Sequence, residues 1–110
     1  MGEMITLTAA DGHEFAAYKV ASNEAPKGCV VIVQEIFGVN SHIKDVCDGY
    51  AKAGFNAIAP ALYDRISPDI ELDYTPKDVE QGLQYKNQVS DETALKDIDA
   101  AANEIDAPGN

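Results

Sequence analysis

The sequence predicts an α/β fold in which a β-hairpin leads into parallel strands flanked by helices. Residues 29–33 are a continuous, largely β-branched apolar run, and residues 55–59 form a second short apolar run that Pro60 closes. Between the two runs, apolar residues recur at the spacing of an amphipathic helix. A strand, a helix and a second strand within about thirty residues form the usual right-handed parallel crossover.

The first part of the chain predicts the hairpin. Residues 4–8 have the alternating pattern of a half-buried strand. Asp11-Gly12 is a strong signal for a hairpin turn, and residues 14–21 then form the returning strand. The segment at residues 22–28 contains a proline and a glycine and is predicted to be a loop.

The run at residues 29–33 and the turn after it are the main candidate for a functional site. A strand that is apolar on both faces is buried on both faces, which favours a central parallel strand covered by helices. The run ends on Gln34 and Glu35, and ligands of open α/β sheets gather at the carboxyl ends of parallel strands. Backbone N–H groups in the following turn can point toward a developing negative charge. The simpler alternative is a strand that ends at the surface with Glu35 in solvent.

The first predicted helix follows this turn directly. Asn40 or Ser41 can cap it, and Gly54 ends it. Its apolar stripe consists of Ile43, Val46, Cys47, Tyr50 and Ala51. After the second apolar run, residues 61–74 are predicted to be a long connection whose acidic side chains are solvated.

Two more helices are predicted in the last third of the chain. Thr75 caps the first of them, Pro76 suits its first turn, and Asp78 would complete a capping box. Its apolar stripe is thin, which is typical of a surface helix or part of a lid. Ser90 starts the last helix, with acidic residues at the positive end of its dipole. The buried stripe predicted for this helix consists of Leu95, Ile98, Ala102 and Ile105.

Composition narrows the class of protein. A chain of 110 residues forms one domain at most, and its formal net charge of -11 argues against partners such as nucleic acid and anionic membranes. No stretch is long enough to span a bilayer, and the start lacks a secretory signal, so we expect a cytoplasmic protein. Cys29 and Cys47 are predicted to be buried free thiols, and no residue spacing predicts a metal site or a cofactor.

The segment at residues 30–65 resembles the dienelactone hydrolase family, a branch of the α/β-hydrolases; it reads VVIVQEIFGVNSHIKDVCDGYAKAGFNAIAPALYDR. The run Gln-Glu-Ile-Phe-Gly followed by Asn is the most specific part of the match. The resemblance implies that Glu35 contacts the nucleophilic thiol in the resting enzyme and that the N–H of Ile36 is one oxyanion-hole donor. It also implies that Tyr85 helps to hold the substrate carboxylate. Gln81 stands where the family carries an arginine, and a neutral amide cannot reproduce the bidentate pairing of an arginine with a carboxylate.

The resemblance covers only the amino-terminal half of a family member. We therefore expect residues 1–110 to form a single partial α/β-hydrolase domain, truncated before the nucleophile elbow of the Gly-x-Cys-x-Gly type. The acid and the histidine of the triad lie later still in the family. The implied function is hydrolysis of a small ester or lactone through an acyl-enzyme, with the catalytic groups supplied by a missing carboxyl-terminal half. The chain alone is expected to be inactive.

Two other readings of the pattern stay open. In the first, the chain is an inactive fragment or a shortened relative, and it self-associates through an open sheet edge because an unpaired strand edge favours association. A nucleotide-binding module shares the strand, helix and strand order, but the turn at residues 34–40 has one glycine where a phosphate-binding loop needs several.

Overall fold

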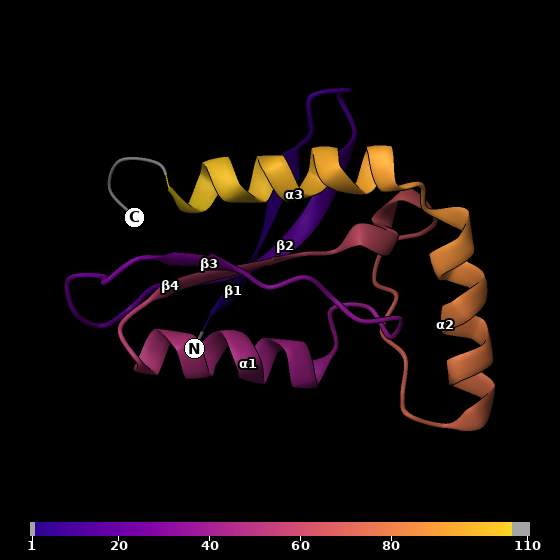
Figure 1. The fold of residues 1–110 in the computed structure, drawn as a ribbon, viewed down its shortest axis with the longest axis horizontal. Coiled ribbons are helices and arrows are strands. Elements are labelled where there is room, and N and C mark those ends of the chain that lie inside the picture. Colours follow the sequence, from indigo (N-terminus) through magenta and orange to yellow (C-terminus); the bar gives the residue numbers. More distant parts are fainter. Residues whose placement is uncertain (1, 107–110) are drawn as a thin grey trace.

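A mixed four-stranded sheet lies between two helices in the computed structural model, which describes residues 2–106 (Figure 1). The strands are, in spatial order, β1 (Glu3–Thr8), β2 (Glu14–Val20), β4 (Asn56–Pro60) and β3 (Cys29–Val31). β1 pairs with β2 and β2 pairs with β4 in antiparallel fashion, whereas β3 and β4 are parallel. The predicted hairpin and the predicted parallel crossover are therefore both present.

The hairpin turn forms where the sequence predicts it. Its pairing runs from Glu3 opposite Lys19 to Thr8 opposite Glu14. Gly12 adopts a φ of 88°, which L-residues with a side chain rarely adopt, so the glycine of the Asp-Gly pair is needed there.

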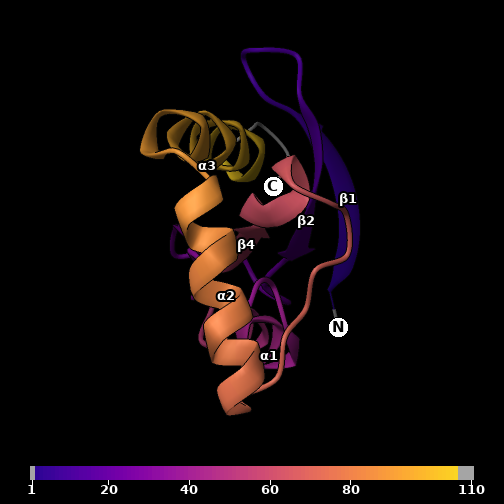
Figure 2. The same cartoon turned by 90° about the vertical axis from the view of Figure 1, so that its right-hand side faces the viewer.

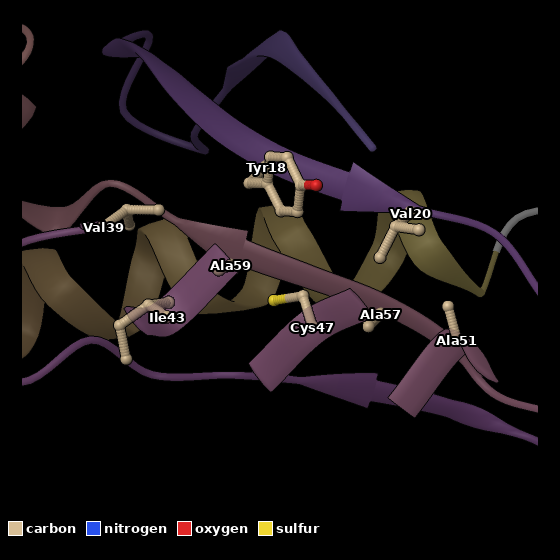
Figure 3. Close-up of a cluster of buried hydrophobic side chains, with 8 residues drawn as sticks. All are labelled: Tyr18, Val20, Val39, Ile43, Cys47, Ala51, Ala57 and Ala59. Carbon is tan, nitrogen blue, oxygen red and sulfur yellow. The ribbon is translucent and has the colours of Figure 1, made fainter. Parts of the chain in front are cut away.

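One face of the sheet packs on helix α1 (Ser41–Lys52) (Figure 3). Asn40 is the N-cap, because its side-chain oxygen accepts a hydrogen bond of 3.2 Å from the N–H of Ile43. Gly54 follows the helix with a φ of 101°. The buried cluster between α1 and the sheet consists of Tyr18, Val20, Val39, Ile43, Cys47, Ala51, Ala57 and Ala59.

The opposite face packs on helix α3 (Asp91–Ile105), which Ser90 caps (Figure 1). The buried cluster on this side consists of Leu7, Ala9, Phe15, Ala17, Ile58, Ala101 and Ile105. The prediction for the buried stripe of this helix is wrong at Leu95, whose exposure is 58%. The buried positions of the helix are Asp97, Ala101 and Ile105, and the carboxylate of Asp97 is paired with Arg65.

The predicted central strand lies at an edge. Within residues 2–106, β3 has one neighbour, and the fully buried central strand is β4. Val30 and Val31 are half-buried, while Cys29 and Val33 are exposed. An apolar strand is expected to be covered on both faces, but its composition does not identify which strands or helices cover it or how many strands pair with it.

Helix α2 (Pro76–Gln88) stands at one end of the layered part rather than on a sheet face (Figure 2). Thr75 caps it by accepting a hydrogen bond of 3.1 Å from the N–H of Asp78. The predicted capping box is half-formed, because the Asp78 carboxylate accepts from the N–H of Asp73 at 2.8 Å.

The predicted connection between β4 and α2 contains one short element that the sequence did not predict, the 3-10 helix η1 (Leu62–Arg65). Of the helices between residues 2 and 106, none combines the length and apolar character needed to cross a bilayer.

Candidate active site at the carboxyl end of β3

A tight turn at residues 35–38 follows β3 after the three residues 32–34. The N–H of Gly38 donates to the carbonyl oxygen of Glu35 at 3.3 Å, which leaves Ile36 and Phe37 at the corner of the turn. Gly38 has a φ of 80°, and a Cβ at this position would collide with the carbonyl oxygen of Ile70. The glycine of the Gln-Glu-Ile-Phe-Gly run is therefore required by the backbone of this turn.

The turn borders an open hollow of about 570 Å³. Its walls come from residues 33–36 after β3, the start of η1, the carboxyl end of α2 and the first turns of α3. The lining residues are Val33, Gln34, Glu35, Ile36, Leu62, Tyr63, Lys86, Val89, Asp91, Ala94, Leu95 and Ile98. A largely apolar hollow of this volume with a few polar groups is typical of sites for small ligands.

Glu35 and Ile36, the two predicted catalytic residues, both line this hollow. The side chain of Glu35 is exposed, and Ile36 is half-buried. The carbonyl oxygen of Ile36 accepts a hydrogen bond of 3.0 Å from the Tyr63 hydroxyl. Among residues 2–106, no hydrogen bond engages the N–H of Ile36.

The two predicted substrate-binding residues, Gln81 and Tyr85, lie on α2 and are half-buried. The Tyr85 ring packs against the Tyr63 ring with centroids 5.5 Å apart. Neither Gln81 nor Tyr85 lines the hollow, so Tyr85 is linked to it through Tyr63. The structure thus brings Glu35 and Ile36 together at the hollow and places Gln81 and Tyr85 on α2, outside its lining.

Tyr63 is a site residue that the sequence does not single out, and Gln34 is one that the sequence marks only as part of the polar end of the apolar run. The Gln34 side chain accepts from the N–H of Leu62 at 2.9 Å and donates to the carbonyl oxygen of Glu35 at 3.3 Å. Burial raises the pKa of the Tyr63 phenol. The available signal for Gln34 was its polar side chain at the end of an apolar run. Tyr63 lay in a predicted loop and carried no signal.

Neither cysteine is placed to react at the hollow. Cys47 is fully buried under the sheet, and burial raises the pKa of its thiol to about 11, as its predicted packing role requires. The prediction that Cys29 is buried is wrong, because Cys29 lies exposed at the start of the edge strand β3. The hollow is at the other end of this strand, and none of its lining residues is serine, cysteine or histidine.

The comparisons with known proteins agree on one family. The family model described as "Dienelactone hydrolase family" matches residues 15–109. The chain is 38% identical to a carboxymethylenebutenolidase of Pseudomonas putida over 102 residues and 35% identical to carboxymethylenebutenolidase 1 of Cupriavidus pinatubonensis over 104 residues. These alignments cover 90% and 92% of this chain.

A crystal structure from Klebsiella pneumoniae, provisionally named a dienelactone hydrolase, superimposes with a TM-score of 0.73 at 33% identity. That match covers 98% of this chain and 46% of the other. The chain spans 42% and 44% of the length of the Pseudomonas and Cupriavidus relatives. The mixed sheet, its flanking helices and these matches together show that the chain belongs to the dienelactone hydrolase family, of which it covers a part.

Proposed function

We propose that the chain contributes an oxyanion-binding wall to a hydrolase site for small esters or lactones. The observation that carries the proposal is the unengaged N–H of Ile36 at the wall of an apolar hollow. A backbone donor held in such a place can stabilise the negative charge that develops on a carbonyl oxygen under attack. Family membership supports the same reaction class, because the relatives above are named as carboxymethylenebutenolidases.

The nucleophile would come from a part of the family domain that residues 2–106 do not contain. The Cys29 thiol lies 3.3 Å from the carbonyl oxygen of Ile105, so α3 ends beside the start of β3. A strand that followed α3 along the open edge of β3 would run parallel to it and end at the hollow. A nucleophile at the end of that strand would stand opposite Ile36, and the exposed Glu35 would be free to hold or orient it.

The proposed reaction has two steps. The nucleophile bonds to the carbonyl carbon, the carbonyl oxygen becomes an oxyanion that the Ile36 N–H receives, and the alcohol leaves with a proton. Water then attacks the acyl-enzyme, and the acid is released as the nucleophile regains its proton. A lactone follows the same steps, except that its alcohol stays attached to the acyl group.

The charges around the hollow favour a neutral substrate. Its lining includes the carboxylates of Glu35 and Asp91 and one cation, Lys86, which leaves a formal charge of −1. Gln81 stands where the family resemblance implies an arginine. An anionic substrate would therefore meet net repulsion at this wall unless other parts of the domain offset it.

The test compares this chain with a form extended to the length of its relatives, using a neutral aryl acetate. We expect turnover by the extended form and none by this chain, and comparable rates from both would refute the proposal. In the extended form, Ile36→Pro removes the N–H donor and should lower kcat by about 10²–10³-fold. Ile36→Val keeps the N–H and should retain most of the activity, so equal losses in both variants would also count against it.

A second candidate function is self-association of the chain. The open edge of β3 and the exposed side chains of Val33 and Leu95, at 51% and 58%, favour it. Sedimentation velocity over a hundredfold range of concentration tests it. A fraction of dimer that increases with protein concentration supports self-association, and a monomer at every concentration rejects it.

A further inference from the structure

Three consecutive carbonyl groups in the turn at residues 35–38 are each held by a different partner. The carbonyl oxygen of Glu35 accepts from the Gln34 side chain at 3.3 Å and from the N–H of Gly38. The carbonyl oxygen of Ile36 accepts from the Tyr63 hydroxyl, and that of Phe37 accepts from the N–H of Leu72 at 2.9 Å. Because a trans peptide directs the C=O of one residue and the N–H of the next to opposite sides, fixing the carbonyls of Glu35, Ile36 and Phe37 fixes the N–H groups of Ile36, Phe37 and Gly38 in turn.

The Tyr63 hydroxyl is one of the side-chain groups that join this turn to neighbouring elements, and it is the one that reaches α2. It lies 3.0 Å from the carbonyl oxygen of Ile36 and 3.1 Å from that of Gly82 on α2. A phenol has one proton, so the two carbonyls share it. Tyr63 itself is buried, with 4% exposure, which restricts the range of positions its hydroxyl can take.

The helix η1 that carries Tyr63 is fixed on its other sides. The N–H of Leu62 donates to Gln34, and the Asp64 carboxylate accepts from the N–H of Ala16 at 2.7 Å. Arg65 forms an ion pair of 2.8 Å with the fully buried Asp97 of α3. Tyr63 thus projects from a segment that is tied both to the sheet and to α3.

We infer that Tyr63 is a positioning residue that holds the Ile36 turn in the orientation needed to receive an oxyanion. This inference rests on the proposed function for its catalytic meaning, but the positioning itself is a property of the chain. Without the phenol, the Ile36 carbonyl loses its partner, and the peptide group that it forms with the Phe37 N–H can rotate. Its rotation loosens the adjoining peptide group, which carries the Ile36 N–H and would then keep its orientation for only part of the time.

Tyr63→Phe in the 110-residue chain, followed by amide hydrogen exchange, tests the positioning. The N–H groups of Gly38 and Leu72 report on the turn, and the N–H of Ile32, bonded to Ile58 in the sheet, reports on the core. We expect exchange at Gly38 and Leu72 to rise roughly fivefold, the factor that corresponds to one typical net hydrogen bond. Exchange at Ile32 should stay within about twofold, since the sheet pairing is untouched.

Tyr50→Phe is the matched control, because Tyr50 is exposed and its hydroxyl makes no hydrogen bond within residues 2–106. Equal exchange at the turn in both variants would overturn the inference. A uniform rise across turn and sheet would overturn it as well, because it would show general destabilisation. In the extended form, Tyr63→Phe should lower kcat with little change in KM. If no form turns over ester, the exchange result still decides the positioning, while the proposed function fails separately.

Discussion

Gly82 offers the sharpest test of how α2 meets the turn, through the substitution Gly82→Ala. A Cβ added at this buried position would lie 2.5 Å from the carbonyl oxygen of Ile36 and 3.2 Å from its carbonyl carbon. Ordinary contact begins near 3.4 Å, so the helix and the turn would have to separate by 0.9 Å. The nearest atom belongs to the backbone, so a side-chain rotation cannot relieve the contact.

Two opposing effects set the size of the change. Alanine is favoured over glycine within a helix by about 1 kcal/mol. Overpacking of this kind typically costs about 1–3 kcal/mol, and the separation also weakens the shared hydrogen bond of Tyr63, which is worth about 1 kcal/mol. We therefore expect Gly82→Ala to lower the free energy of unfolding by about 1–3 kcal/mol.

Gly49→Ala is the control, because Gly49 lies within α1 and a Cβ there meets no atom within 4 Å. This variant should gain about 0.5–1 kcal/mol from helix propensity alone. Urea denaturation of both variants and the parent, compared at equal m-values, measures the difference. If Gly82→Ala is as stable as Gly49→Ala, then α2 does not press on the turn in solution and the reasoning is refuted.

Three further predictions concern pH, thiols and the uncovered face of α3. The hydrogen bond from Arg65 lowers the pKa of Asp11 from 3.8 to about 2, so the Asp11 carboxylate binds a proton at higher pH in the unfolded chain than in the folded one, and the free energy of unfolding falls as pH drops from about 4 to about 2. Asp11→Asn should remove this contribution when unfolding is measured across that pH range. An unchanged pH dependence would contradict the prediction. With a thiol reagent that reports absorbance, Cys29 should react in the native chain and Cys47 only after denaturation, so two fast thiols would be the contrary result. Leu95→Ala should change stability by less than about 0.5 kcal/mol, whereas Ile105→Ala, at a buried position, should cost about 2–5 kcal/mol in the same denaturation assay, and similar costs would argue that Leu95 is covered.

The elements of this fold are predictable where local chemistry decides them. The caps at Asn40, Thr75 and Ser90 and the turn at Asp11-Gly12 all depend on groups within three or four residues of each other. Such contacts leave their signal in the sequence itself, since the same residue types serve the same purpose in most helices and hairpins.

Positions set by distant partners were not predictable in the same way. Asp97 is fully buried in its helix, and its counterion is Arg65, 32 positions earlier in the chain. The edge position of β3 depends on which other strands are present in the sheet, and the apolar composition of β3 does not indicate this.

The candidate site divides in the same way. The polar end of an apolar run indicated Gln34 and Glu35, the family resemblance indicated Ile36, and the structure places all three at the hollow. Their catalytic roles stay predictions. The hydrogen bonds of Gln34 with Leu62 and of Tyr63 with Ile36 join residues that are 28 and 27 positions apart, so no local sequence pattern predicts them.

The ion pairs of Arg65 have a consequence for what the family site can recognise here. The printed sequence contains a single arginine, and its guanidinium is occupied by the carboxylates of Asp97 and Asp11, at 2.8 Å and 2.9 Å. Freeing it would leave a charge on Asp97 without a counterion inside the protein, which typically costs about 3–5 kcal/mol. No free guanidinium group is therefore left within these 110 residues to bind an anionic ligand in a bidentate way. Recognition of such a ligand would depend on lysine ammonium groups, on main-chain amides or on another polypeptide segment.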